Sequence, residues 1–278
     1  MPAGFDLHTH SLISDGTTRP SEIAAEAAGI GLAGFALTDH DTIDGWDEAR
    51  EAAAAHGIDF LPGIEVTTKH GWHSPHVLGY GVDPTASALF DALDRVREAR
   101  FSRTRRMVDL LAADYDIDWD GVVGDSEVIT VGRPHIADAL IAAGYFEDRG
   151  AAFADVLHPR SPYYVSMTAL DTVEAIRLIR AAGGVAVLAH PAARRQHEPV
   201  SSEELDEYAG AGLWGIELEH PENRKRWLPA LRAAAAELGL QPTGSSDFHG
   251  EGKPNRLGEH TTPLEVVERI RALCAVPR

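Results

Sequence analysis

Cysteine is almost absent from this chain, because Cys274 is the only one among its 278 residues. A single cysteine excludes an internal disulfide and indicates a reducing compartment. Long hydrophobic runs are absent too: the sequence has no stretch of about 18 apolar residues of the kind that spans a bilayer. Residues 1–12 do not resemble a signal peptide. These absences predict a cytoplasmic protein without a membrane partner.

Positive charge is also scarce. The chain has 25 lysine and arginine residues against 43 acidic ones, which gives a formal net charge of -18. Such a surface repels nucleic acid and anionic membranes at long range. This argues against a long nucleic-acid duplex as a partner, and a phosphorylated ligand would need a locally positive site.

Short apolar runs alternate with alanine-rich stretches along much of the chain. The runs predict seven strands, over residues 5–8, 33–38, 59–66, 76–82, 184–189, 214–218 and 241–245. The stretches between them predict helices, over residues 20–29, 44–56, 168–182, 201–210, 222–238 and 263–273. This alternation is typical of an α/β fold with a mainly parallel sheet and helices outside it. Seven strands favour a barrel related to the eight-stranded one, although an open sheet also fits.

The alternation stops between residues 88 and 166. There the pattern predicts helices alone, over residues 88–113, 133–143 and 147–158. We interpret residues 88–166 as a small helical insertion, or cap, domain in a barrel domain formed by residues 1–87 and 167–278. The alternative is an elaborate crossover that belongs to the same domain.

Ionisable residues gather at the ends of the predicted strands. Asp6, His8 and His10 are spaced two apart, so they project to the same side of a strand. The other strand ends hold His40, Glu65, His76, His190, Asp247 and His249. In parallel barrels the carboxyl ends of the strands form one face, where active sites lie. One such histidine is usually a hydrogen-bonded structural residue, but this many imidazoles and carboxylates together indicate divalent transition metals.

Seven short motifs carry most of these residues. They are DLHTH (6–10), SDGTTRP (14–20), LTDHDT (37–42), GIEV (63–66), HVLGYGV (76–82), LAHP (188–191) and GSSDFH (244–249). In this order they resemble the PHP (polymerase and histidinol phosphatase) family of metal-dependent phosphoesterases. The resemblance implies a distorted (β/α)7 PHP barrel. It is strongest to a stand-alone bacterial branch that acts on nucleotides with 3′ and 5′ phosphates and has a helical insertion after the fourth strand.

The resemblance also implies a site for three divalent ions, with Mn²⁺ favoured and Fe or Zn²⁺ as alternatives. The ligand sets would be His8, His10, Glu65 and Asp247 for one ion, Glu65, His76 and His190 for the second, and Asp15, His40 and His249 for the third. Glu65, Asp247 and His190 would be catalytic. Some members of the family have histidine where Asp15 stands, and a carboxylate there favours a harder ion such as Mn²⁺.

Several polar residues near these motifs have two interpretations. Asp6 and Asp39 would either hold a ligand imidazole through its second N–H or make ordinary hydrogen bonds at a strand end. His70 or His73 could replace His76 as a ligand, although only His76 begins an apolar strand.

Cations in the predicted insertion are candidates for substrate binding. Arg133 and His135 lie at the start of a predicted helix, where backbone N–H groups also favour anions. Similar residues bind substrate phosphate in the related nucleotidases. The arginine-rich segment 95–106 could contact substrate, but a solvated helix with acidic partners explains it as well. His220, at the end of the sixth predicted strand, could face the site.

The implied reaction is hydrolysis of a phosphoester by water, because ions that share a carboxylate can lower the pKa of bound water towards about 7. The resemblance favours a nucleoside 3′,5′-bisphosphate, with removal of the 3′ phosphate to leave a nucleoside 5′-monophosphate. It also allows trimming of short 5′-phosphorylated oligonucleotides. Histidinol phosphatase activity and a non-catalytic metal-binding interaction module are the alternatives. The oligomeric state is not predicted.

Overall fold

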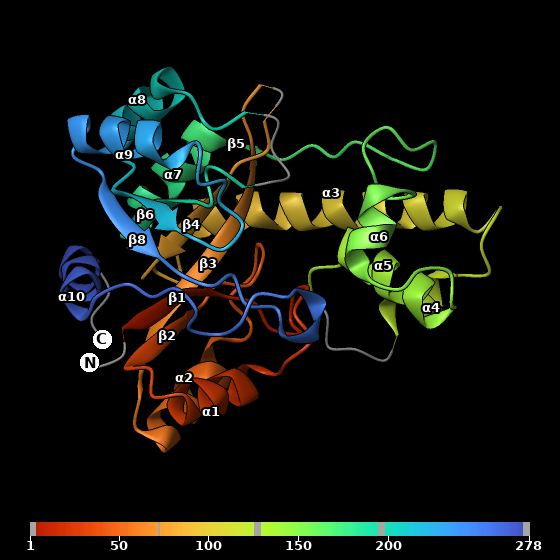
Figure 1. Cartoon of the computed structure of the whole chain (residues 1–278), viewed down its shortest axis with the longest axis horizontal. Helices are drawn as coiled ribbons and strands as arrows, with labels where there is room; N and C mark the ends of the chain where they lie inside the picture. Colours follow the sequence, from red (N-terminus) through yellow and green to blue (C-terminus); the bar gives the residue numbers. More distant parts are fainter. Residues whose placement is uncertain (1–3, 72, 125–128, 194–197, 275–278) are drawn as a thin grey trace.

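The computed structural model describes residues 4–71, 73–124, 129–193 and 198–274, and Figure 1 shows their arrangement. One sheet runs through the molecule. Its strands are β1 (Phe5–Thr9), β2 (Gly34–Leu37), β3 (Asp59–Lys69), β4 (His76–Tyr80), β5 (Leu170–Asp171), β6 (Val185–Ala189), β7 (Gly215–Glu219) and β8 (Gln241–Gly244). They follow the order β1-β2-β3-β4-β6-β7-β8, with β5 paired to the end of β3.

The sheet curls until its two ends meet. His10 N, just after β1, donates to Phe248 O at 2.8 Å, and Thr9 forms a parallel bridge with Phe248, just after β8. Buried apolar side chains such as Leu7, Leu78 and Val187 fill the interior. The predicted α/β fold with a distorted barrel is confirmed.

Strand β4 departs from the mainly parallel sheet that the sequence predicted. It is antiparallel to both of its neighbours, β3 and β6. The link between Lys69 and His76 is too short for the crossover that a parallel strand needs. Because β4 runs in the opposite direction, its first residue lies at the edge where the parallel strands end, and His76 pairs in register with Ala189.

Helices cover the outside of the sheet (Figure 1). In the described residues they are α1 (Pro20–Gly29), α2 (Trp46–His56), α3 (Ser87–Leu111), α4 (Trp119–Val123), α5 (Arg133–Ala142), α6 (Arg149–Ala154), α7 (Thr172–Ala181), α8 (Ser202–Ala211), α9 (Leu228–Glu237) and α10 (Leu264–Leu273). Gly250–Gly252 adds one 3₁₀ turn, η1. None of these helices is long and apolar enough to cross a membrane.

Most predicted helices form, with shifted ends. The predicted helix 168–182 begins only at Thr172, because the Asp171 carboxylate accepts from Val173 N at 3.0 Å and Glu174 N at 3.1 Å and so caps α7. Leu170 and the cap residue itself form β5 instead. The predicted helix 222–238 begins at Leu228, and the short helix α4 was not predicted.

Helix α3 contributes to two hydrophobic cores. Its first half packs Leu93 and Val96 into the core shared by the sheet and α7–α9. Its second half packs Met107 and Leu111 against α4, α5 and α6, which lie together on one side of the barrel (Figure 1). The helix therefore passes from one core to the other. The division into domains at residues 88 and 166 stays a prediction.

Candidate metal centre

The nine residues predicted as metal ligands lie at one edge of the curled sheet. His8 and Glu65 are in β1 and β3, His76 begins β4, and the others follow the carboxyl ends of β1, β2, β6 and β8. All are buried except the half-buried His76. Positions spread from residue 8 to residue 249 therefore meet in one cluster.

Glu65 is at the centre of this cluster. Its Oε1 lies 2.7 Å from His76 Nδ1 and 3.1 Å from His190 Nε2. Its Oε2 lies 3.1 Å from His10 Nε2, 3.2 Å from His40 Nδ1 and 3.4 Å from His8 Nε2. A carboxylate with each oxygen among imidazole nitrogens has the arrangement of a group that bridges two cations.

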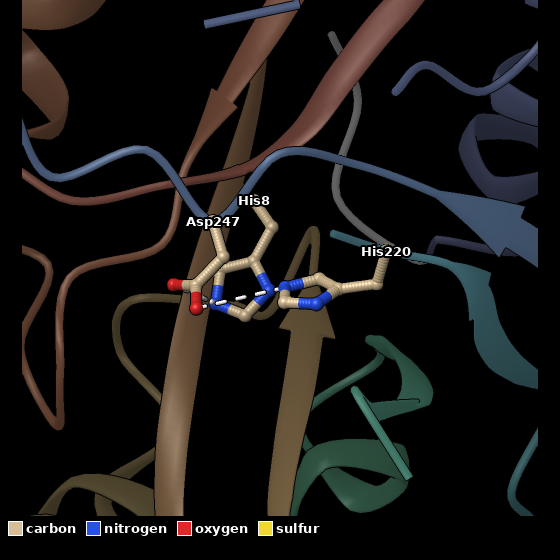
Figure 2. A group of neighbouring side chains, drawn as sticks. All are labelled: His8, His220 and Asp247. Carbon is tan, nitrogen blue, oxygen red and sulfur yellow. Dashed lines mark ion pairs between the residues drawn. The ribbon is translucent and has the colours of Figure 1, made fainter. Parts of the chain in front are cut away.

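Asp247 and Asp15 extend the cluster on either side of His10. Asp247 Oδ1 lies 3.5 Å from His8 Nε2 and 3.4 Å from His10 Nε2, and Figure 2 shows Asp247 beside His8. Asp15 lies 3.3 Å from His249 Nε2 and 3.7 Å from His40 Nε2. The groups of side chains that could hold a metal ion overlap: His10 lies with His8 and Glu65, with Asp247 and His249, and with Asp15 and His40. The division of the nine residues into three ligand sets therefore stays a prediction.

The second nitrogen of two imidazoles is fixed by a hydrogen bond. His8 Nδ1 donates to Glu217 Oε1 at 3.2 Å, and His249 Nδ1 donates to Asp247 O at 2.9 Å. In the neutral form of each ring the proton is therefore on Nδ1, and the Nε2 lone pair is left to face the cluster.

The pKa values of the cluster shift in both directions. Burial lowers the pKa of His8 and His10, but the Glu65 carboxylate between them outweighs burial and raises both pKa values. Burial lowers the pKa of His40 and His249, which favours the neutral ring. Burial raises the pKa of the Glu65 and Asp15 carboxyls, but the imidazoles around them outweigh it and keep each pKa well below its usual range. His40 Nδ1 is buried without a hydrogen-bond partner in the described structure. Imidazoles and ionised carboxylates buried together are the ligand types that a divalent transition metal takes.

Backbone strain also concentrates at these strand ends. Asp41, His190 and Asp247 are the non-glycine residues with positive φ in the described chain, at 57°, 26° and 55°. Such conformations are costly and persist only where the surroundings enforce them. The folded structure therefore holds the loops after β2, β6 and β8 in one geometry.

Glu217 on β7 is a site residue that sequence reasoning missed. Its Oε1 accepts from His8 Nδ1 and from Ser245 Oγ, and its Oε2 accepts from His190 N at 2.8 Å. Burial raises the pKa of this carboxyl, but His8 and His220 outweigh burial and hold the pKa at about 2. The signal was a carboxylate in the otherwise apolar run WGIEL.

Asp6 and Asp39, which would either hold an imidazole or make ordinary hydrogen bonds at a strand end, differ from each other in the structure. Asp6 accepts from Ser246 N at 3.0 Å and Gly258 N at 2.8 Å, so it makes backbone hydrogen bonds between segments. Asp39 accepts from Ser14 Oγ at 2.7 Å, and Ser14 Oγ lies 3.4 Å from His10 Nδ1. Asp39 therefore reaches an imidazole through one serine.

His70 and His73 lie against α8 instead of entering the cluster. His70 Nε2 is 3.5 Å from Glu207 Oε2, and His73 Nε2 is 3.7 Å from Glu204 Oε1. His76 alone of the three lies beside Glu65.

The predicted substrate-binding pair lies at the start of α5. Arg133 Nη1 donates to Leu157 O at 3.3 Å, and its guanidinium lies 5.1 Å from the Phe153 ring centroid. His135 is buried, its Nδ1 accepts from Gly132 N at 3.0 Å, and burial lowers its pKa. The positive charge predicted for this position is therefore on Arg133, and contact of either residue with substrate stays a prediction.

Some arginines of segment 95–106 in α3 make surface ion pairs, and others bind a loop of the barrel. Arg97 pairs with Asp94, as the solvated interpretation expected, but its Nη1 also donates to Asp41 O at 2.7 Å. Arg100 is nearly buried, and its Nη2 donates to Asp41 Oδ2 at 3.1 Å. Helix α3 thus holds the loop that carries His40.

Two further contacts join the helical part to the ligand loops. Thr130 Oγ1 donates to His40 O at 2.8 Å. Arg149 Nη1 donates to Asp15 O at 2.9 Å. The loops of the third predicted ligand set are therefore supported by residues outside the barrel.

Known proteins resemble the chain over almost its full length. A model of the PHP domain family matches residues 6–125. The chain is 36% identical over 271 residues to a 3′,5′-nucleoside bisphosphate phosphatase of Chromobacterium violaceum, with 96% of this chain and 94% of that protein covered. It is 31% identical over 252 residues to a 5′-3′ exoribonuclease of Haemophilus influenzae, with 90% and 91% covered.

A solved structure is also similar. It comes from Bifidobacterium adolescentis and is described as a metal-dependent phosphoesterase. It matches with a TM-score of 0.96 at 40% identity, covering 99% of this chain and 98% of the other. Similarity at this level extends through the helical segment as well as the barrel.

Proposed function

The chain belongs to the PHP domain family and is a metal-dependent phosphoesterase, and from this premise we propose that it hydrolyses nucleoside 3′,5′-bisphosphates at the 3′ phosphate. The product would be a nucleoside 5′-monophosphate. The observation that carries the chemistry is the position of Glu65, whose two oxygens lie among five imidazoles. The substrate class follows the activity named for the Chromobacterium violaceum relative.

Three divalent ions, with Mn²⁺ favoured, are proposed for this cluster of side chains. The ligand sets are His8, His10, Glu65 and Asp247; Glu65, His76 and His190; and Asp15, His40 and His249. Ions bound there supply a water molecule of lowered pKa and an electrophilic grip on phosphoryl oxygen.

The chain's own residues hold this arrangement in place. Glu65 and Asp247 are the proposed catalytic carboxylates, because each has oxygens directed at more than one imidazole. His190 is the third proposed catalytic residue, and its backbone N–H is held by Glu217. Glu217 also orients His8, so one buried carboxylate sets the direction of groups on two different strands.

A second phosphate on the substrate requires a positive group outside the cluster, because the chain as a whole is strongly acidic. Arg133 is the proposed group. It lies at the start of α5, where backbone N–H groups add to its charge. His135 next to it offers a neutral ring instead of a second cation. A bisphosphate would use both Arg133 and the metal cluster, whereas a simple monophosphate would use one of them.

Short 5′-phosphorylated RNA is a second candidate substrate. The relative from Haemophilus influenzae, similar over 90% of this chain, is named a 5′-3′ exoribonuclease. A phosphodiester would then take the place of the 3′ phosphate. The net charge of -18 restricts such a substrate to short lengths.

The test is a comparison of kcat/KM on Mn²⁺-loaded protein for adenosine 3′,5′-bisphosphate, AMP, 3′-AMP, histidinol phosphate and a 5′-phosphorylated trinucleotide, with the products identified by mass. The bisphosphate should be preferred and should yield AMP. Preference for histidinol phosphate, or release of 3′-AMP from the bisphosphate, would refute the assignment.

A further inference from the structure

His220, just after β7, is fully buried beside the proposed metal ligands and belongs to none of the three sets. Figure 2 shows its ring directed towards His8 and Asp247. The side chain has no exposed surface. Its Nδ1 accepts a hydrogen bond from Glu222 N at 3.1 Å. In the neutral ring the proton must therefore be on Nε2, the nitrogen that faces the cluster.

This proton position distinguishes His220 from the ligand histidines. His8 and His249 donate through Nδ1 and present a lone pair on Nε2. His220 accepts through Nδ1 and presents an N–H. A metal ion needs the lone pair, so the hydrogen bond from Glu222 makes His220 a donor and not a ligand.

The Nε2–H group has no hydrogen-bond acceptor among the described residues. Asp247 Oδ2 is 3.6 Å away and Glu217 Oε2 is 3.8 Å away, both beyond hydrogen-bond distance. Leaving a buried donor without an acceptor costs free energy, and native structures rarely do so without a reason. A donor held in this way suits an acceptor that arrives with a ligand.

A cation lies on the same side of Asp247. Lys253 Nζ is 2.6 Å from Asp247 Oδ2, the oxygen nearest to His220 Nε2. The other oxygen, Oδ1, faces His8, His10 and His249 at 3.4–3.5 Å. Asp247 thus has one oxygen near the ligand imidazoles and the other near an ammonium group and His220, whose ring also lies 6.2 Å from that of His8 and 5.2 Å from that of His190.

We propose that His220 Nε2–H and Lys253 Nζ form an oxyanion subsite that binds a non-bridging oxygen of the phosphoryl group undergoing hydrolysis. The subsite rests on the proposed function, since it requires a phosphoester at the metal cluster. The two groups suit a phosphoryl oxygen because that oxygen is anionic, accepts several hydrogen bonds and keeps its charge during transfer. His220 acts as a hydrogen-bond donor through Nε2.

The first test determines directly which ring nitrogen of His220 carries the proton. In Zn²⁺-loaded protein with ¹⁵N-labelled histidine, a two-dimensional ¹⁵N–¹H spectrum should show His220 with its proton on Nε2, assigned by the signal lost in His220→Gln. A His220 ring with its proton on Nδ1 would overturn the proposal, because Nε2 would then be a ligand atom. This measurement does not depend on enzymatic activity.

The second test measures binding of inorganic phosphate to Mn²⁺-loaded protein by calorimetry, with metal content determined for each sample. His220→Ala should raise the phosphate Kd by roughly ten- to a hundredfold with the metal content unchanged. His220→Gln should recover part of the affinity, because its amide also carries N–H donors. His56→Gln, on the exposed face of α2, is the matched control.

An unchanged phosphate Kd in His220→Ala, or wild-type protein that does not bind phosphate, would overturn the subsite. Loss of metal from His220→Ala would overturn it too, since His220 would then act on the ions. These outcomes are independent of substrate choice. A protein that prefers histidinol phosphate would refute the proposed function, while weaker phosphate binding in His220→Ala would still support the subsite.

Discussion

Glu217 Oε1 lies 3.2 Å from His8 Nδ1, so a carboxylate on β7 holds an imidazole on β1 across the interior of the barrel. Neither side chain has any exposed surface. The same carboxylate accepts from His190 N at 2.8 Å. One buried residue therefore sets the orientation of a proposed ligand of the first ion and of the backbone that carries a proposed ligand of the second.

Replacing this carboxylate should weaken metal binding. In Glu217→Gln the acceptor for His8 Nδ1–H is lost or weakened, and the Mn²⁺ affinity should fall by roughly ten- to a hundredfold. Competition with a fluorescent chelator gives the affinity. Glu219→Gln, at the exposed end of β7, is the control and should bind like wild type. Equal Mn²⁺ affinity of both variants would show that Glu217 does not support the metal site.

Glu65→Gln should abolish turnover while the fold stays largely intact. A neutral amide in place of the central carboxylate weakens the attraction for two proposed ions at once. Elemental analysis should find more than one ion per wild-type chain and fewer in the variant, while the circular dichroism spectra should agree. Near-normal kcat with full metal content would show that Glu65 is not the bridge.

Arg133→Ala should lower kcat/KM for the bisphosphate by roughly ten- to a hundredfold, the effect of losing about 1.5–3 kcal/mol from a charge-assisted hydrogen bond. Metal content should not change, because the partners described for Arg133 are Leu157 O and the Phe153 ring, which are not proposed ligands. Arg106→Ala, exposed on α3, is the matched control. Wild-type kinetics of Arg133→Ala on every phosphorylated substrate would exclude Arg133 from the site.

Arg100→Ala should destabilise the protein by about 3 kcal/mol, because it leaves the buried Asp41 carboxylate without its cation. Urea unfolding at a fixed Mn²⁺ concentration gives the free energy of unfolding, since bound metal also adds to stability. Arg105→Ala removes an exposed arginine from the same helix. This variant should change the free energy of unfolding by less than about 0.5 kcal/mol. Similar values for the two variants would mean that α3 does not hold the His40 loop through Arg100.

The position of His76 shows how far the sequence pattern could reach. The pattern predicted a strand that begins at His76, in a mainly parallel sheet where functional residues lie at the ends of strands. The strand is present, but it is antiparallel to β3 and β6. Only this reversal brings its first residue to the edge where the other strands end. Periodicity shows which side of a strand a residue faces, but it does not show the direction of the strand.

Apolar runs and the polar residues that end them are local features, so the sequence alone determined the α/β class, the helical segment and the candidate ligands at the strand ends. Partners that meet across the barrel are not local. Glu217 and His8 are in β7 and β1, and Arg100 and Asp41 are in different parts of the fold. Tertiary structure alone decided these relationships, because an oriented hydrogen bond depends on three-dimensional distance and direction.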